Sequence, residues 1–128
     1  MINLKPVVLQ ALESNQALLS LLGGKRIYQL VAPDAEEFPR VTFFELDNRD
    51  YSFADDTALS SEIKFQISVW SKGSTSAIAM EVDKTMKELG FQRYFATDLY
   101  EDDTKVFHKP MRYRTQKEAE TWQEYKLG

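Results

Sequence analysis

The sequence predicts an α+β fold, in which an antiparallel β-sheet of about four to five strands carries two helices on one face. Between Ser61 and Lys72, apolar residues alternate with polar ones, and the apolar set is Ile63, Phe65, Ile67 and Val69. Successive side chains of a strand point to opposite faces, so this strand buries one face and leaves the other in water. Alternation of this kind is typical of an antiparallel sheet covered on one side.

The second observation is a helical repeat between Ser74 and Leu89. Apolar residues recur there at spacings of three and four, and Gly90 supplies a stop. Such a helix gains its stability mainly from packing, so we expect it to lie on the apolar face of the strand at 61–72.

Length and composition favour one domain and exclude several kinds of site. The chain has 128 residues, no cysteine, one histidine and a formal charge of −4. A disulfide framework, a thiolate metal site and a multi-histidine metal site within one chain are therefore excluded. The sequence shows neither a signal peptide nor a membrane-spanning run, so we expect the protein to be made and kept in the cytoplasm. We expect one domain over residues 1–115 and a polar segment over 116–128, formed as a short helix or a tail.

The amino-terminal half predicts one helix and two strands. Residues 3–22 have an amphipathic pattern that ends at Gly23-Gly24, and residues 25–31 suit a short edge strand. Residues 33–39, bracketed by two prolines, predict a loop, and residues 40–46 predict a second strand. Phe43 and Phe44 are adjacent in that strand, so one of them must be covered by a flanking segment or by another subunit.

Residues 47–58 predict a long polar connection between two strands. Hairpin loops usually have two to five residues, and longer ones tend to be functional or flexible. Tyr51 and Phe53 are aromatic within this polar stretch, so they either fold back onto the sheet or meet a partner.

The carboxyl-terminal half predicts a strand pair at 91–99 and 104–115, joined by the acidic turn at 100–103. Pro110 cannot donate a hydrogen bond to a neighbouring strand, so we expect the last strand to lie at an edge or to be bulged there.

No residue pattern names a reaction. The acidic groups lack the spacing of a calcium loop and indicate solvated turns; they are Asp47, Asp50, Asp55, Asp56, Glu101, Asp102 and Asp103. His108 has no Ser or Asp partner at motif spacing, and Gly23-Gly24 lacks the spacing of a phosphate-binding loop. A hydrolase that uses the scattered carboxylates would need a cleft that holds two of them.

A basic and aromatic cluster marks the last strand pair. Its cations are Arg93, Lys105, Lys109, Arg112 and Arg114, and its aromatic residues are Tyr94, Phe107 and Tyr113. This mixture can bind single-stranded nucleic acid, which gives an alternative function as a small binding module for that or another ligand. Cross-strand charge pairing or an assembly contact is the other interpretation.

The order of short motifs resembles the tail completion, or tail-to-head joining, proteins of long-tailed bacteriophages and prophages. The motifs are Arg26-Ile27-Tyr28, Phe38 to Phe43, Gln66 to Lys72, Leu89-Gly90-Phe91, the acidic hairpin at 98–103 and Arg112-Tyr113-Arg114. The resemblance covers about residues 4–115. Proteins of this family look like tail terminators in fold.

The resemblance implies a non-enzymatic virion protein without cofactor or metal. It implies a ring, a hexamer in the virion, with the head connector or neck protein and the tail tube protein as partners, and no membrane or specific nucleic acid. By that analogy the assembly interface contains Asn48, Arg49, Asp50, Tyr51, Phe53, Asp55, Asp56, Arg112 and Arg114.

Overall fold

The computed structural model describes the backbone of residues 1–54 and 57–118 and the side chains of residues 1–51 and 60–118. Three helices and six strands follow one another along the chain. They are α1 (Lys5–Glu13), α2 (Gln16–Leu22), β1 (Ile27–Gln29), β2 (Arg40–Ala54), β3 (Thr57–Ser71), α3 (Ser76–Glu88), β4 (Gln92–Ala96), β5 (Leu99–Glu101) and β6 (Val106–Glu118).

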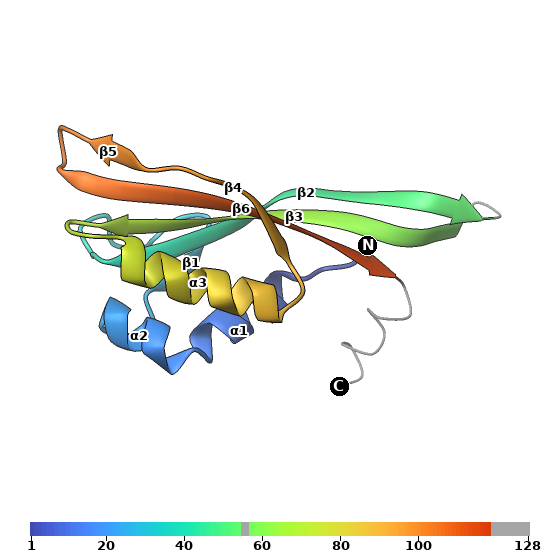
Figure 1. The fold of residues 1–128 in the computed structure, drawn as a ribbon, viewed down its shortest axis with the longest axis horizontal. Helices are drawn as coiled ribbons and strands as arrows, with labels where there is room; N and C mark the ends of the chain where they lie inside the picture. Colours follow the sequence, from blue (N-terminus) through green and yellow to red (C-terminus); the bar gives the residue numbers. More distant parts are fainter. Residues whose placement is uncertain (55–56, 119–128) are drawn as a thin grey trace.

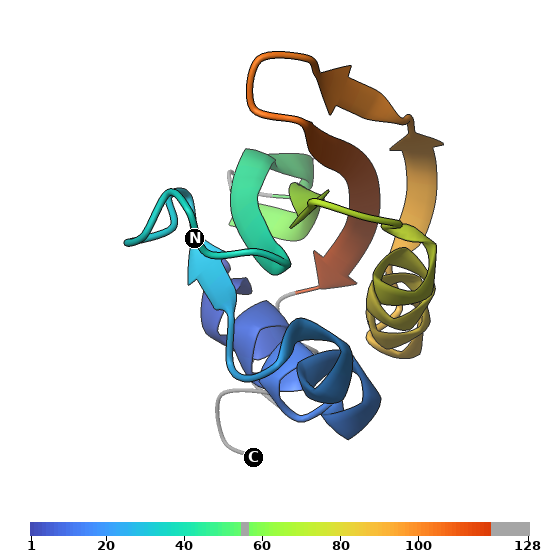
Figure 2. The same ribbon diagram turned by 90° about the vertical axis from the view of Figure 1, so that its left-hand side faces the viewer.

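The strands form one sheet in the order β1-β2-β3-β6-β4, and β5 also pairs with β6. All neighbours are antiparallel except β1, which runs parallel to β2. The three helices lie on the same side of the sheet (Figures 1 and 2). The predicted α+β class is confirmed, but the sheet is mixed and has six strands, and a third helix joins the two that were expected. The opposite side of the sheet is called the uncovered face below.

The core lies between the helices and the sheet. The alternation in β3 is confirmed, because Ile63, Phe65, Ile67 and Val69 are all fully buried. Residues from α1, α2 and α3 pack in the same cluster; they include Val8, Leu12, Leu18, Leu22, Ile78, Val82 and Met86. Phe43 points into this cluster, and Phe44 lies half-buried on the uncovered face. Whether another subunit covers Phe44 stays a prediction.

The single helix expected over residues 3–22 is wrong, because the chain breaks at Ser14 and Asn15 into α1 and α2. The Asn15 side chain accepts a hydrogen bond from the Leu18 amide, 3.0 Å away, and so caps α2. Its amide nitrogen also donates to Thr85 Oγ1 at 2.9 Å. The break therefore fastens the α1–α2 corner to α3.

Replacing Asn15 by alanine should lower the free energy of unfolding by about 1–2 kcal/mol, because the cap and the link to Thr85 are both lost. Asn15→Asp keeps the cap acceptor but loses the donor, so we expect a smaller loss. Urea denaturation checks both variants against Ser14→Ala, an exposed neighbour that should change stability by less than about 0.5 kcal/mol. Equal stability of the alanine variants at 14 and 15 would contradict this role.

The long loop expected at residues 47–58 is also wrong. β2 and β3 continue as a paired ribbon, and their register runs from Arg40↔Trp70 to Ala54↔Thr57. An irregularity between Glu45 and Asp47 shifts the pairing by one residue. Backbone hydrogen bonds between two long strands outweigh the weak strand propensity of these polar residues. Residues 55 and 56 lie outside the described part of the chain.

Pro110 does not lie in an edge strand, because β6 runs between β3 and β4 with β5. The Pro110 carbonyl accepts a hydrogen bond from the Thr97 amide at 3.3 Å. In an antiparallel strand the nitrogen and the carbonyl of one residue point to the same side, so the missing N–H of Pro110 also faces the break between β4 and β5. The pairing of β6 with β3 is therefore unaffected by the missing amide proton. β6 also continues to Glu118, beyond the expected end at Thr115, and residues 119–128 lie outside the described part.

Candidate interaction surfaces

The most distinctive surface is the far end of the β2–β3 hairpin. Figure 1 shows it extending well beyond the helices. This segment, residues 48–54 and 57–61, is called the arm below. Seven residues of a strand span about 23 Å, which is the approximate length of the β2 part of the arm.

The structure places four of the predicted interface residues on the arm, on alternating sides. Asn48 pairs with Ile63 and Asp50 with Ser61, so both lie on the side of the helices. Arg49 pairs with Glu62 and Tyr51 with Ser60, on the uncovered side. The backbone of Phe53 pairs with Ala58, whereas Asp55 and Asp56 lie outside the described residues.

Polar contacts fix the base of the arm. The side-chain amide of Asn48 donates from Nδ2 to the Ile2 backbone carbonyl at 2.7 Å. Ser61 Oγ donates to Asp50 Oδ1 at 2.7 Å. Arg49 lies 3.4 Å from Glu62 and 3.8 Å from Asp47. These contacts align the strands at the point where they leave the body.

The β2 edge of the arm is open within the described residues. β1 pairs with β2 only as far as Phe43, whereas β6 pairs with the other side of the ribbon as far as Ser60↔Glu118. Among the described residues, the edge of β2 beyond Phe43 therefore carries backbone groups without a strand partner. Such an edge is ready to pair with another chain.

The basic cluster predicted at the last strands is divided between the two faces of the sheet. Arg93 contacts Asp83 at 3.1 Å and Lys109 contacts Asp98 at 3.0 Å, so both cations are charge-paired. Their partners lie in α3 and in the segment between β4 and β5, and not across strands as expected. Tyr113 is buried in the core, and Phe107 packs against Tyr100 with ring centroids 4.8 Å apart. Arg112 and Arg114 lie on the uncovered face, in register with Gln66 and Lys64 of β3.

Asp83 of α3 forms a polar centre that the sequence does not reveal. Its Oδ1 accepts from Tyr113 Oη at 2.8 Å and from Arg93 Nε at 3.1 Å, and its Oδ2 lies 2.8 Å from Lys87 Nζ. Partial burial disfavours its charge, but the hydrogen bonds from Lys87, Tyr113 and Arg93 outweigh burial and lower the pKa of Asp83. Burial, followed by the bond to Asp83, raises the pKa of Tyr113. These contacts tie α3 to the sheet and are structural.

His108 stacks on Trp70, with ring centroids 3.6 Å apart and planes within 8°. Burial lowers the pKa of His108, and the nearby charge of Glu101 opposes this only in part. The imidazole is thus neutral at pH 7 and acts as a flat packing surface.

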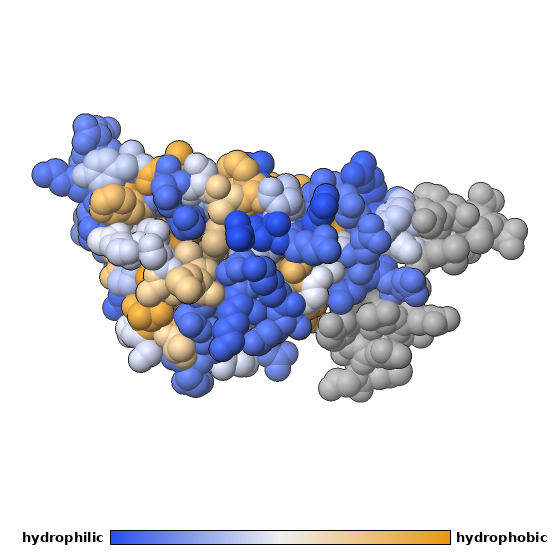
Figure 3. Space-filling view, viewed as in Figure 1, coloured by the Kyte–Doolittle hydropathy of each residue, from blue (hydrophilic) through white to orange (hydrophobic). Residues whose placement is uncertain are grey.

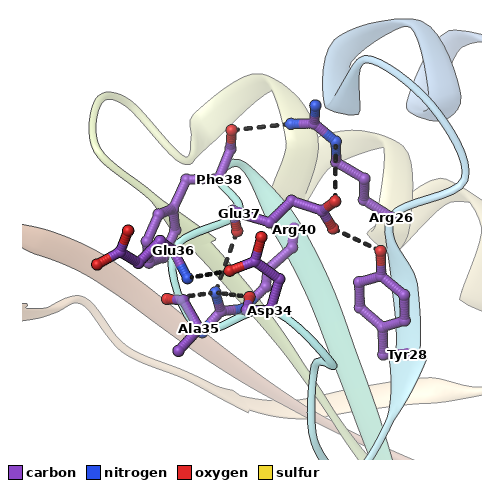
Figure 4. A network of polar contacts seen from close by, with 8 residues as sticks. All are labelled: Arg26, Tyr28, Asp34, Ala35, Glu36, Glu37, Phe38 and Arg40. Atoms are coloured by element: carbon purple, nitrogen blue, oxygen red, sulfur yellow. Dashed lines mark hydrogen bonds and ion pairs between the residues drawn. The ribbon is translucent and has the colours of Figure 1, made fainter.

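The loop between β1 and β2 is held by arginines at both of its ends (Figure 4). Arg26 Nη1 donates to the Phe38 carbonyl at 2.9 Å, and Arg40 Nη1 donates to three loop carbonyls, that of Glu37 at 3.0 Å. The loop borders a pocket of about 560 Å³, whose lining residues include Glu36 and Glu101. Asp83, a carboxyl group whose pKa is lowered, does not line this pocket.

A smaller hollow of about 320 Å³ lies between α3 and β4, lined partly by Ala79, Met80 and Met111. Met80 is 72% exposed, and Leu99, Tyr100 and Phe107 are also exposed. Figure 3 shows apolar colour gathered toward the end of the molecule opposite the arm, whereas the described surface near the arm is mainly polar.

Within residues 1–54 and 57–118, no group of three or more His, Asp or Glu side chains is arranged to hold a metal ion. None of the described helices is long and apolar enough to cross a membrane.

Comparisons with known proteins relate this chain to phage tails. The family described as tail completion protein gp17 matches residues 6–117. The fold is similar to that of a chain in the solved virion of a native gene transfer agent particle, with a TM-score of 0.62 and 17% sequence identity. That alignment covers 88% of this chain and 92% of the other chain, and at this identity it shows a shared fold. No curated protein sequence matches this chain.

The family match spans the helices, the sheet and both strands of the arm, and it confirms the resemblance found in the sequence. The chain is therefore a structural tail protein and belongs to the family of tail completion protein gp17.

Proposed function

We propose that this protein completes a phage or prophage tail by forming a ring at its upper end and joining it to the head connector, without catalytic activity. The observation that carries the proposal is the arm, a β-ribbon that leaves the body with its β2 edge open among the described residues. A protein that worked alone would gain nothing from such an edge, which favours aggregation.

An open strand edge on one side of the subunit suits assembly into a ring. The β2 edge of one copy can meet a different surface of the next copy, which is a head-to-tail contact. Contacts of this kind close into a ring when the rotation between copies permits it. The hexamer, the tail tube and neck proteins as partners, and a place in the virion after assembly in the host cytoplasm are parts of the same proposal.

The polar side chains of the arm fit a protein that stays soluble until it assembles. Arg49 and Asp50 place charges on β2, the open edge of the ribbon, and charges on edge strands suppress unwanted pairing. Arg112 and Arg114 lie in the part of β6 that pairs with β4, so the ring contact proposed here depends on the arm alone.

Shortening the arm should abolish tail-to-head joining and leave the fold intact. In this variant residues 51–60 are replaced by Asn-Gly. The two new residues form a hairpin turn that connects Asp50 directly to its strand partner Ser61. Circular dichroism should show a cooperative unfolding transition like that of the parent chain. Electron microscopy of particles made with the variant should show heads and tails that remain separate.

The matched control shortens the turn at the other end of the sheet. Replacing residues 102–105 by Asn-Gly retains the pair Glu101↔Val106 and removes a similar exposed turn. Joining should persist in the control. Normal joining by the chain with the shortened arm would rule out the arm as the assembly element.

A further inference from the structure

The uncovered face carries a cluster of cations and aromatic rings at the middle of the sheet. Lys64 of β3 is in register with Arg114 of β6, and Gln66 is in register with Arg112. These side chains have the parity opposite to Phe65 and Tyr113, which are buried under the helices. The three cations therefore lie on one surface.

A β-bulge brings two aromatic residues to the same surface. The pairing of β4 with β6 shifts between Arg93 and Phe95, so Tyr94 and Phe95 both lie beside the cations. Arg112 Cζ is 4.9 Å from the centre of the Phe95 ring. Lys64 Nζ and Arg114 Cζ each lie 5.8 Å from the centre of the Tyr94 ring. Tyr94 is 40% exposed and Phe95 39% exposed, so the rings are also open to solvent.

The cations of this cluster are poorly neutralised. Two of the three have no acidic partner: among the described residues, no carboxylate lies within 4.0 Å of Arg112 or Arg114. Lys64 is the exception, since it meets Glu62 at 3.7 Å and is in register with Asp47. Arg112 Nε donates instead to the neutral Gln66 side chain at 3.1 Å. On the side of the helices, by contrast, Arg93 and Lys109 each have an acidic partner. A chain of net charge −4 thus presents a local positive surface.

We propose that this surface, formed by Lys64, Tyr94, Phe95, Arg112 and Arg114, binds the phosphodiester backbone of nucleic acid without sequence preference. Cations beside solvent-open aromatic rings provide both charge and a stacking surface, the combination that binds nucleic acid independently of sequence. Nucleic acid uses both features, because its phosphates pair with the cations and its bases stack on the rings. The binding does not depend on ring formation, so it can be tested on the isolated chain.

The test is the binding of labelled oligonucleotides of about 20 nucleotides, as a single strand and as a duplex, measured by fluorescence anisotropy at several salt concentrations. If three cations neutralise one phosphate each, the logarithm of the affinity should fall with the logarithm of salt with a slope near −2 for the single strand. Arg112→Gln with Arg114→Gln should weaken binding by about tenfold or more and lower the slope by about 1.4.

The matched control is Lys25→Gln with Lys84→Gln, which removes the same charge from exposed positions outside the cluster. Its affinity should remain within about twofold of the parent chain. Equal weakening by both double variants, or no binding by the parent chain at about 50 mM salt, would overturn the proposal. Sedimentation velocity measures the self-association of the parent chain and of the double variant Arg112→Gln with Arg114→Gln. If the double variant changes self-association but not oligonucleotide affinity, the surface is a subunit contact and the proposal fails.

Discussion

Replacing Phe65 by alanine should lower the free energy of unfolding by about 3–5 kcal/mol, the largest effect expected from one side chain of this fold. Phe65 is fully buried at the centre of β3, between Phe43 at 6.4 Å and Phe91 at 5.8 Å, measured between ring centroids. It lies where the strand at the middle of the sheet meets the helices. Removing its ring leaves a cavity that rigid neighbours on two strands cannot fill.

A loss of that size is a large fraction of the 5–15 kcal/mol that stabilises a typical domain. Phe65→Leu therefore serves as a second variant that stays folded, with an expected loss of about 1–1.5 kcal/mol. Phe44→Ala is the control on the uncovered face, where part of the ring is already in water, and it should lose less than half as much as Phe65→Ala. Urea denaturation measures all three, and equal losses at 44 and 65 would show that the helices do not define the core.

The body of the fold is predictable because its signals are local and repeated. The alternation in β3 indicated which residues face the helices, and the spacing in α3 indicated which residues face the sheet. Ile67 and Val82 illustrate this, since both are fully buried as expected. Each pattern repeats over several turns or pairs, so one exception does not change the interpretation.

The arm was not predictable in the same way, because its structure depends on pairing between strands rather than on its own residues. Asp47 to Asp50 have weak strand propensity, and no buried face produces alternation there. The single residue inserted near Leu46 also changes the side to which every later residue of β2 points. The parallel pairing of β1 has the same origin, because a strand of three residues carries no signal of its direction.

The break at Asn15 carried a local signal that was interpreted incorrectly. The amphipathic pattern over residues 3–22 favoured one helix, although asparagine, present at position 15, is among the preferred capping residues. The contact between Tyr113 and Asp83 carried no such signal, because the two residues are thirty positions apart and belong to different elements. Alternation along a strand places Tyr113 on the same face as Met111, and both are buried, but it does not indicate that the Tyr113 hydroxyl meets a carboxylate.

Replacing Tyr113 by phenylalanine should lower the free energy of unfolding at pH 7 by about 1.5–3 kcal/mol, the range for a hydrogen bond to a charged group. Tyr113 is fully buried, and its hydroxyl donates to Asp83 at 2.8 Å. Phenylalanine keeps the packing of the ring, so the loss reports the polar contact. The exposed Tyr100 provides the control, and Tyr100→Phe should change stability by less than about 0.5 kcal/mol.

The pH dependence separates this contact from simple packing. Because the pKa of Tyr113 is raised in the folded chain, unfolding releases a proton above about pH 10, the ordinary pKa of tyrosine. The stability that Tyr113 contributes is complete below that pH and is lost as the pH rises further. The parent chain should therefore lose more stability than Tyr113→Phe between about pH 9.5 and 11. Asp83 acts in the opposite range, because its lowered pKa stabilises the fold above about pH 4 and the contribution is lost as the pH falls. Parallel stability curves for the parent chain and Tyr113→Phe in alkali would show that the hydroxyl does not control this loss.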